Sequence, residues 1–226
     1  MKIISCKNLV KNYQNAKVLT KVLNNIDLTI EQGEFCGITG PSGSGKTTLL
    51  YTLSGLEKLT SGDLFLFEKN INEYTNNEIA DMRKNQIGFV FQFYNLIPNL
   101  TAFENIKLAQ IIAKCDDDEK VLNALKMVEM AEFKDYFPNE LSGGMQQRVA
   151  IARCLVNEPT VIFADEPTGN LDQKNGQEIM NIFQKLNQQQ GITIVLVTHS
   201  EDNLHYCTRH IKLTDGKIIH DEKLTV

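Results

Sequence analysis

Apolar and polar positions along this chain predict strands that alternate with helices. Ile26, Leu28 and Ile30 alternate with polar neighbours, which predicts a half-buried strand ending at a turn over residues 31–33. Further short, mostly apolar segments of strand length are 34–39, 63–67, 87–91, 161–165 and 192–198. Because strands separated by helices favour parallel pairing with right-handed crossovers, we predict an α/β fold with a mostly parallel sheet.

The spacing of apolar residues becomes helical between residues 98 and 137. Two helical stripes comprise Phe103, Ile106, Leu108, Ile111 and Ile112, then Val121, Leu122, Leu125, Val128 and Met130. This block separates two sheet-forming halves, so we predict a helical subdomain at roughly 93–150. A further helix is predicted at about 174–189, and the Asp215-Gly216 turn predicts a hairpin over residues 211–219.

An acidic run, Asp116 to Glu119, lies between the two helical stripes. We interpret it as the solvated start of the second helix, because acidic side chains favour helix N-termini. A metal site is the less favoured alternative.

Composition limits the possible classes of protein. The 226 residues suit one α/β domain, with or without a small subdomain. A net charge of −5 argues against a surface that coats nucleic acid. The five cysteines form no C-x-x-C pair, which suggests free thiols in a reducing compartment. No apolar stretch has membrane-spanning length, so we expect the chain to be cytoplasmic.

Residues 40–47 fit the phosphate-binding pattern G-x-x-x-x-G-K-S/T between a predicted strand and a predicted helix. Glycines allow the backbone to wrap an anion, and the helix start directs free N–H groups at it. Lys46 would reach the β- and γ-phosphates, and the Thr47 hydroxyl would ligate Mg²⁺. The alternative is an ordinary Gly/Ser turn. The residues expected to hold the nucleotide here are Gly40, Pro41, Ser42, Gly43, Ser44, Gly45, Lys46, Thr47 and Thr48.

An acidic pair follows the predicted strand at 161–165. Asp165 and Glu166 stand at its carboxyl end, where open α/β sheets place ligand groups. We assign Asp165 to the Mg²⁺ shell and Glu166 to polarising the attacking water. Without a phosphate loop, such a pair would more often cap the next helix.

A second candidate anion site precedes the helix that follows residue 144. Ser142 can cap this helix, and Gly143 and Gly144 leave its first N–H groups unshielded. A second phosphate-facing helix start, far from the loop in sequence, has no obvious purpose in a simple monomeric NTPase.

Taken together, these segments resemble the nucleotide-binding subunit of an ATP-binding cassette (ABC) transporter over essentially the whole chain. The matching motifs are Walker A at 40–47, the glutamine-loop Gln92, the signature at 141–144, Walker B at 161–165, the catalytic Glu166, a D-loop at 169–172 and the switch His199. The resemblance implies one ABC ATPase domain over residues 1–226. Its P-loop core would carry an N-terminal antiparallel β portion and the helical subdomain.

The resemblance also implies roles for residues that the pattern alone does not assign. Gln92 would contact Mg²⁺ and join Lys46, Glu166 and His199 in catalysis, with His199 at the γ-phosphate. Tyr13 stands where the family stacks an aromatic ring on adenine. Each has a structural alternative: a polar strand end for Gln92, a structural histidine for His199 and simple packing for Tyr13.

Partners also follow from the resemblance. A second copy would bind head to tail, with each ATP between the Walker A loop of one copy and the signature of the other. The apolar segment 91–100 would receive an integral membrane permease, placing the chain on the inner face of the membrane without nucleic acid. The motifs around residues 88–105 are similar to the macrolide-export, lipoprotein-release and antimicrobial-peptide-resistance group.

Met145 departs from the family pattern, which usually has glutamine at the fifth signature position. The change bears on nucleotide affinity or on a polar contact across the dimer. Alternatives remain open: a cell-division-type cassette that moves no cargo, a non-transport ABC ATPase, and a nucleotide-gated module without hydrolysis. The intact Lys46, Asp165, Glu166 and His199 argue against the last of these.

Overall fold

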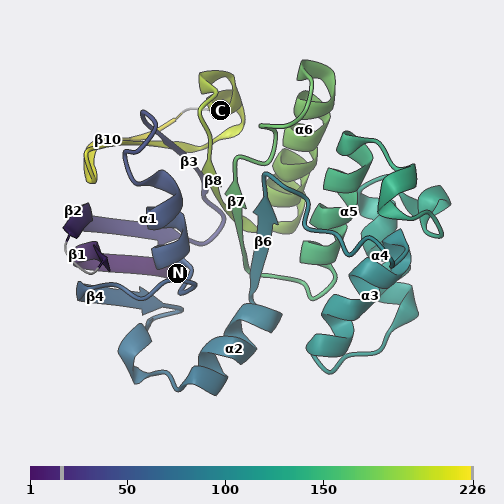
Figure 1. Cartoon of the computed structure of the whole chain (residues 1–226), viewed down its shortest axis with the longest axis horizontal. Helices are drawn as coiled ribbons and strands as arrows, with labels where there is room; N and C mark the ends of the chain where they lie inside the picture. Colours follow the sequence, from purple (N-terminus) through teal and green to yellow (C-terminus); the bar gives the residue numbers. More distant parts are fainter. Residues whose placement is uncertain (16–17, 225–226) are drawn as a thin grey trace.

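The larger sheet of the protein is the mostly parallel sheet that the sequence predicts. The computed structural model describes residues 1–15 and 18–224, and Figure 1 shows the arrangement of their elements. The strand order is β10-β9-β3-β8-β7-β6, parallel from β9 to β6 and antiparallel between β9 and β10. The strands are β3 (Phe35–Thr39), β6 (Ile87–Phe91), β7 (Val161–Asp165), β8 (Thr193–Val197), β9 (Arg209–Thr214) and β10 (Lys217–Lys223).

The predicted C-terminal hairpin is confirmed. β9 and β10 pair on either side of Asp215 and Gly216. Both turn residues have positive φ, 47° and 71°, the backbone conformation that two-residue hairpin turns favour.

A second, antiparallel sheet has the order β2-β1-β4-β5. Its strands are β1 (Lys2–Asn15), β2 (Val18–Glu31), β4 (Ser61–Leu66) and β5 (Lys69–Asn70). Ile26, Leu28 and Ile30 are buried on β2, as their alternation predicts. The N-terminal antiparallel portion implied by the family resemblance is therefore present.

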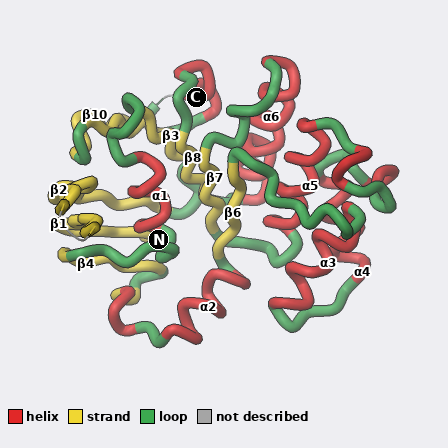
Figure 2. Tube along the Cα trace, viewed as in Figure 1, coloured by secondary structure: helices red, strands yellow, loops and turns green. Residues whose placement is uncertain are grey.

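Helices lie between the two sheets and at the far end of the molecule (Figures 1 and 2). α1 contacts strands of both sheets, whereas α3, α4 and α5 pack on one another away from the antiparallel sheet. The helices are α1 (Lys46–Leu53), α2 (Asn76–Asn85), α3 (Ala102–Ile112), α4 (Asp118–Met127), α5 (Gly143–Leu155) and α6 (Gln173–Gln190). Short 3-10 helices span Ile71–Glu73, Ala131–Phe133, Pro138–Glu140 and Glu201–Tyr206. The second predicted stripe ends early, since α4 stops at Met127 rather than Met130.

The two faces of the larger sheet pack against two different hydrophobic cores. Ile162 and Ala164 of β7 pack with apolar residues of α5 and α6. Val161 and Phe163, which alternate with them, pack with α1 and the antiparallel sheet. Because side chains along a strand point to opposite faces, β7 is apolar throughout until Asp165, where the strand ends.

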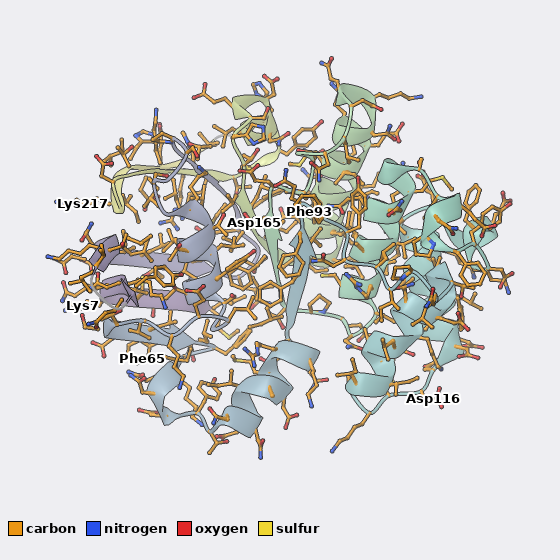
Figure 3. The ribbon with its side chains drawn as sticks, in the orientation of Figure 1. Lys7, Phe65, Phe93, Asp116, Asp165 and Lys217 are labelled. Atoms are coloured by element: carbon orange, nitrogen blue, oxygen red, sulfur yellow. The ribbon has the colours of Figure 1, made fainter. Side chains whose placement is uncertain are left out.

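The acidic run is a helix start, as predicted. The Asp117 side chain accepts hydrogen bonds from the backbone N–H groups of Glu119 and Lys120 at the beginning of α4. Lys107 of α3 forms ion pairs with Asp116 and Asp118. Figure 3 shows Asp116 at the edge of the helical region, far from Asp165 near the centre. No helix within residues 1–15 and 18–224 has the length and apolar content needed to cross a bilayer.

Candidate functional site: a phosphate loop facing two carboxylates

The loop between β3 and α1 is shaped by glycines whose backbone conformations residues with a side chain rarely adopt. Gly40, Gly43 and Gly45 have φ values of 149°, 77° and 99°, which L residues with a side chain seldom adopt. A Cβ on Gly40 would lie 2.0 Å from the carbonyl oxygen of Leu213. The loop therefore folds tightly against β9 and turns its backbone toward α1.

Lys46 folds back over this loop. Its ammonium donates to the carbonyl oxygens of Gly40 and Pro41, at 2.9 and 3.0 Å. The buried Ser44 hydroxyl has no hydrogen-bond partner among the described residues, although buried polar groups in proteins are normally paired. A glycine-lined loop with a lysine ammonium and an unpaired serine hydroxyl has the chemistry that binds a phosphate group.

A cleft of about 560 Å³ opens above the loop. It brings together, from distant parts of the sequence, most of the predicted phosphate-loop residues and three of the four predicted catalytic residues, Lys46, Glu166 and His199. The lining comprises Val22, Gly40, Ser42, Gly43, Gly45, Lys46, Thr47, Thr48, Glu166 and His199.

Asp165 ends β7 beside the start of α1. Its Oδ1 accepts a hydrogen bond from the Thr47 hydroxyl at 3.1 Å, and its Oδ2 accepts one from the Tyr51 hydroxyl at 3.0 Å. Burial raises the pKa of the Asp165 carboxyl, whereas these two donors act in the opposite direction. Thr47 and Asp165 thus place a hydroxyl oxygen and a carboxylate oxygen side by side, and hard oxygen ligands of this kind are those that Mg²⁺ prefers.

Glu166 turns the chain sharply after the strand. It has a φ of 47°, an uncommon conformation for a residue with a side chain, and one that tends to occur at functional sites. Its backbone N–H donates to the carbonyl of Val197 at 2.9 Å, which anchors the turn to β8. His199, just beyond β8, has Nδ1 2.9 Å from Glu166 Oε2. The carboxylate and the imidazole therefore face the cleft as a pair.

The helix start predicted as a second anion site lies elsewhere in the chain. Ser142 caps α5, because its hydroxyl accepts a hydrogen bond from the Met145 N–H at 3.3 Å. A Cβ on Gly143 would lie 2.7 Å from the Tyr94 hydroxyl, and one on Gly144 would lie 2.5 Å from Asn175 Oδ1. Ser142 is exposed, and none of these three residues lines the cleft. Within one chain, the phosphate loop and this helix start do not meet.

The family model described as "ABC transporter" matches residues 23–169. The chain belongs to this family. It is an ATP-binding cassette with ATPase function, as the resemblance in its motifs implied.

Relatives of known sequence support the assignment over the full chain. An uncharacterized ABC transporter ATP-binding protein, MJ0796 of Methanocaldococcus jannaschii, is 44% identical, and the match covers 98% of this chain and 97% of that protein. The macrolide export ATP-binding/permease protein MacB of Bdellovibrio bacteriovorus is also 44% identical, covering 98% of this chain but only 34% of MacB.

Solved structures support the fold. A dimeric structure of a post-hydrolysis state of the cassette MJ0796, bound to ADP and Pi, has a TM-score of 0.90 and 42% identity, with 99% of each chain covered. Another dimeric structure of MJ0796 also has a TM-score of 0.90, with 43% identity and the same coverage. The predicted ABC ATPase fold is confirmed by these likenesses.

Gln92 of the cassette lies outside the cleft lining and pairs with the D-loop. Its Nε2 donates to Asn170 Oδ1 at 3.2 Å, and Asn170 Nδ2 donates back to the Gln92 carbonyl at 3.1 Å. A Cβ on Gly169 would approach Gln92 Nε2 to 3.0 Å. The glutamine is therefore held by the loop that follows Glu166, through its Nε2 and its backbone carbonyl, and neither bond uses its side-chain oxygen.

Tyr13 of the cassette lies on β1, and it too does not line the cleft. Its hydroxyl donates to the Glu57 carboxylate, and the Lys11 ammonium lies 4.6 Å from its ring centroid. Burial and the hydrogen bond to Glu57 raise the pKa of the phenol. Lys11 also pairs with Glu57 at 3.2 Å, so the ring is held in place on the exposed surface of the antiparallel sheet.

Two contacts in the cassette add to what the sequence analysis gives. Met145 packs partly against the helical core, so its side chain fills space there, and its backbone N–H serves the cap on α5. Tyr51 was not predicted as a site residue, yet it contacts Asp165 directly. Its position one helical turn after Thr47 was the available signal, because residues four apart share a helix face.

Proposed function

We propose that two copies of this cassette bind head to tail, with ATP between the loop at 40–47 of one copy and the α5 start of the other. The observation that carries the proposal is the separation of the two sites: Ser142 is exposed and caps α5, yet it lies outside the cleft that contains Lys46. A second chain can supply what one chain lacks. The dimeric state of the MJ0796 cassette supports this arrangement.

Each cleft residue has a role in ATP binding that follows from its chemistry. The backbone of residues 40–45 and the N–H groups at the start of α1, including those of Thr47 and Thr48, would wrap the phosphates. Lys46 would exchange its two carbonyl acceptors for the β- and γ-phosphate oxygens. Tyr13 would stack on adenine, since a base has an apolar face that any aromatic ring can cover.

Metal binding is assigned to Thr47 and Asp165, with the side-chain oxygen of Gln92 as a further ligand. The hydroxyl, carboxylate and amide oxygens form the donor set that Mg²⁺ takes in proteins. When bound, Mg²⁺ would neutralise charge on the β- and γ-phosphates.

Hydrolysis is assigned to Glu166 and His199. The Glu166 carboxylate faces the loop and would accept a proton from the attacking water. His199 would donate a hydrogen bond to the γ-phosphate in place of the one that its Nδ1 shares with Glu166 Oε2. Loss of the γ-phosphate would remove the charge that holds the two copies together, so the dimer would reopen.

Mixing two inactive variants tests whether the site is shared between chains. Lys46→Met removes the loop cation and Ser142→Arg blocks the α5 start, so each homodimer should be inactive. The mixed dimer contains one intact pair, the Lys46 of one chain facing the Ser142 of the other. With random pairing, half of the dimers in an equal mixture are mixed, and each mixed dimer has one intact site of two. We therefore expect the mixture to regain about a quarter of the native ATPase rate.

If the mixture stays as inactive as its components while each variant remains folded, the shared site is wrong. Mixing each variant with itself provides the baseline.

A membrane permease is the proposed second partner, and the cassette would then lie peripherally on the inner face of the membrane. In this proposal residues 1–226 form one ATPase domain, with residues 93–150 as its helical subdomain. Two exposures support a docking surface there. Phe93 is 70% exposed and Ile97, four positions later in the sequence, is 40% exposed, and exposed apolar groups often mark contact sites. Leu96 differs, because it packs against the helical core.

Phe93→Glu should abolish co-isolation with the permease from solubilised membranes and leave the ATPase rate of the isolated cassette within about twofold. The reason is that Phe93 is largely exposed, and surface substitutions change stability by only about 0.5 kcal/mol. Ile219→Glu, at an apolar residue 59% exposed on β10, is the matched control. Undiminished co-isolation of the Phe93 variant would argue against this surface. Leu96 is less suitable for this test, because a charge there would also disturb the core.

A further inference from the structure

α1 presents two hydroxyl groups to the same carboxylate. Thr47 donates to Asp165 Oδ1 at 3.1 Å, and Tyr51, one helical turn later on the same face, donates to Asp165 Oδ2 at 3.0 Å. Burial and the nearby Asp165 charge raise the pKa of Tyr51 to about 12, so its hydroxyl keeps its proton at neutral pH. Both oxygens of Asp165 are therefore held from one helix.

A row of aromatic rings fixes the position of Tyr51. Its ring packs edge-on against Phe91, with centroids 6.4 Å apart at an angle of 71°. Phe91 stacks on Phe89 at 5.9 Å, and Phe89 stacks on Phe163 at 5.7 Å. The row thus runs from Phe163 in the buried middle of β7, through two rings of β6, to Tyr51, which contacts Asp165 at the end of β7.

Strand register explains why this row ends at the acid. In the parallel ladder of β6 and β7, Phe89 is the partner of Phe163, and Phe91 is the partner of Asp165. The ring that supports Tyr51 is thus directly opposite the residue that its hydroxyl contacts. Phe163 is fully buried, so the row is rooted in the core.

We propose that Tyr51 is a positioning residue that orients the Asp165 carboxylate for metal binding, an inference that rests on the proposed metal role of Asp165. A carboxylate rotates readily about its last torsion, where preferences are broad. With Oδ2 held by Tyr51, Oδ1 stays beside the Thr47 hydroxyl and the phosphate loop. Partners of this kind typically contribute 10–100-fold to metal affinity.

Two other effects of the hydroxyl predict different results. A hydrogen bond draws charge from the carboxylate, and if this effect dominated, its removal would tighten metal binding. If Tyr51 served only to pack against Phe91, removing its hydroxyl would leave metal affinity unchanged. The sign of the change therefore separates the three roles.

Tyr51→Phe tests the proposal because it removes the hydroxyl and keeps the ring. Mn²⁺, which suits the same oxygen ligands as Mg²⁺, is titrated into the full chain with a non-hydrolysable ATP analogue, and free Mn²⁺ is measured by electron paramagnetic resonance. We expect Mn²⁺ affinity to fall about tenfold or more. Affinity for a fluorescent ATP analogue in EDTA should stay within about twofold.

Tyr74→Phe is the matched control. The Tyr74 hydroxyl also makes one hydrogen bond, 3.0 Å to the Leu66 carbonyl, but Tyr74 lies outside the site. Its Mn²⁺ affinity should equal that of the native chain, and its melting temperature shows what one lost tyrosine hydrogen bond costs. Replacing Tyr51 by p-aminophenylalanine restores a donor at the same place and should recover most of the Mn²⁺ affinity.

Unchanged or tighter Mn²⁺ binding by Tyr51→Phe would overturn the proposal. So would an equal loss in Tyr74→Phe, or no recovery with p-aminophenylalanine. If the native chain with nucleotide bound Mn²⁺ no better than an Asp165→Asn variant, the assignment of Asp165 itself would fail. That outcome is distinct from a failure of Tyr51 alone.

Discussion

Glu166→Gln should lower the ATPase rate by at least about 100-fold and leave ATP affinity within a few-fold of native. A general base contributes roughly 10²–10⁴ to a rate, and an amide cannot accept the proton from water. Gln has nearly the same size as Glu and can still form the hydrogen bond with His199. The backbone at this position has a φ of 47° in either case. Phosphate release under saturating ATP and Mg²⁺ measures the rate, and equilibrium dialysis measures the affinity.

His199→Gln and Glu178→Gln help to interpret this result. The His199 variant should slow hydrolysis as well, because that ring faces Glu166 in the cleft. Glu178 pairs with Arg148 at 2.9 Å and lies outside the cleft, so its variant controls for the loss of one carboxylate. A native rate in Glu166→Gln would remove Glu166 from the mechanism.

Lys46→Met should weaken ATP binding by about 10–150-fold and abolish turnover. Hydrogen bonds to charged groups contribute roughly 1.5–3 kcal/mol, which corresponds to this range. Met keeps the length of the buried stem, but the loop loses the donor to the carbonyls of Gly40 and Pro41. The same dialysis and phosphate-release measurements apply. They distinguish the two variants, because Glu166→Gln should bind ATP without hydrolysing it, whereas Lys46→Met should bind ATP poorly.

Lys185→Met, at an exposed residue on α6, controls for the loss of one positive charge. Native affinity in Lys46→Met would contradict the role of this residue as the phosphate cation. A large fall in melting temperature would instead assign Lys46 chiefly to holding the empty loop together.

Much of the larger sheet and of the phosphate loop could be predicted because their signals are local. The loop at 40–47 needs adjacent glycines and a lysine, and buried parallel strands such as 161–165 are continuously apolar. β1 was not predicted from its residue pattern, because its pairing with β2 shifts register at several points and the alternation is interrupted. α2 was missed because only Met82 is buried on it. The capping box of Thr75 and Glu78 was the available signal for that helix.

Other parts of the site depend on contacts between distant segments, which sequence patterns do not reveal. Gln92 and Asn170 are 78 positions apart and meet only in the folded chain. The contact of Tyr51 with Asp165 depends on the register that sets Phe91 opposite that acid. The distance between Ser142 and the cleft also emerges only from the fold, and it is this separation that calls for a second chain.

Light scattering of Glu166→Gln with ATP and Mg²⁺ shows whether nucleotide joins two copies of the chain. We expect a particle of twice the 25.5 kDa mass of the chain, which returns to the single mass with ADP and is absent when Lys46→Met is added to the same variant. A particle that stays at 25.5 kDa while ATP is bound would contradict the nucleotide-bridged dimer.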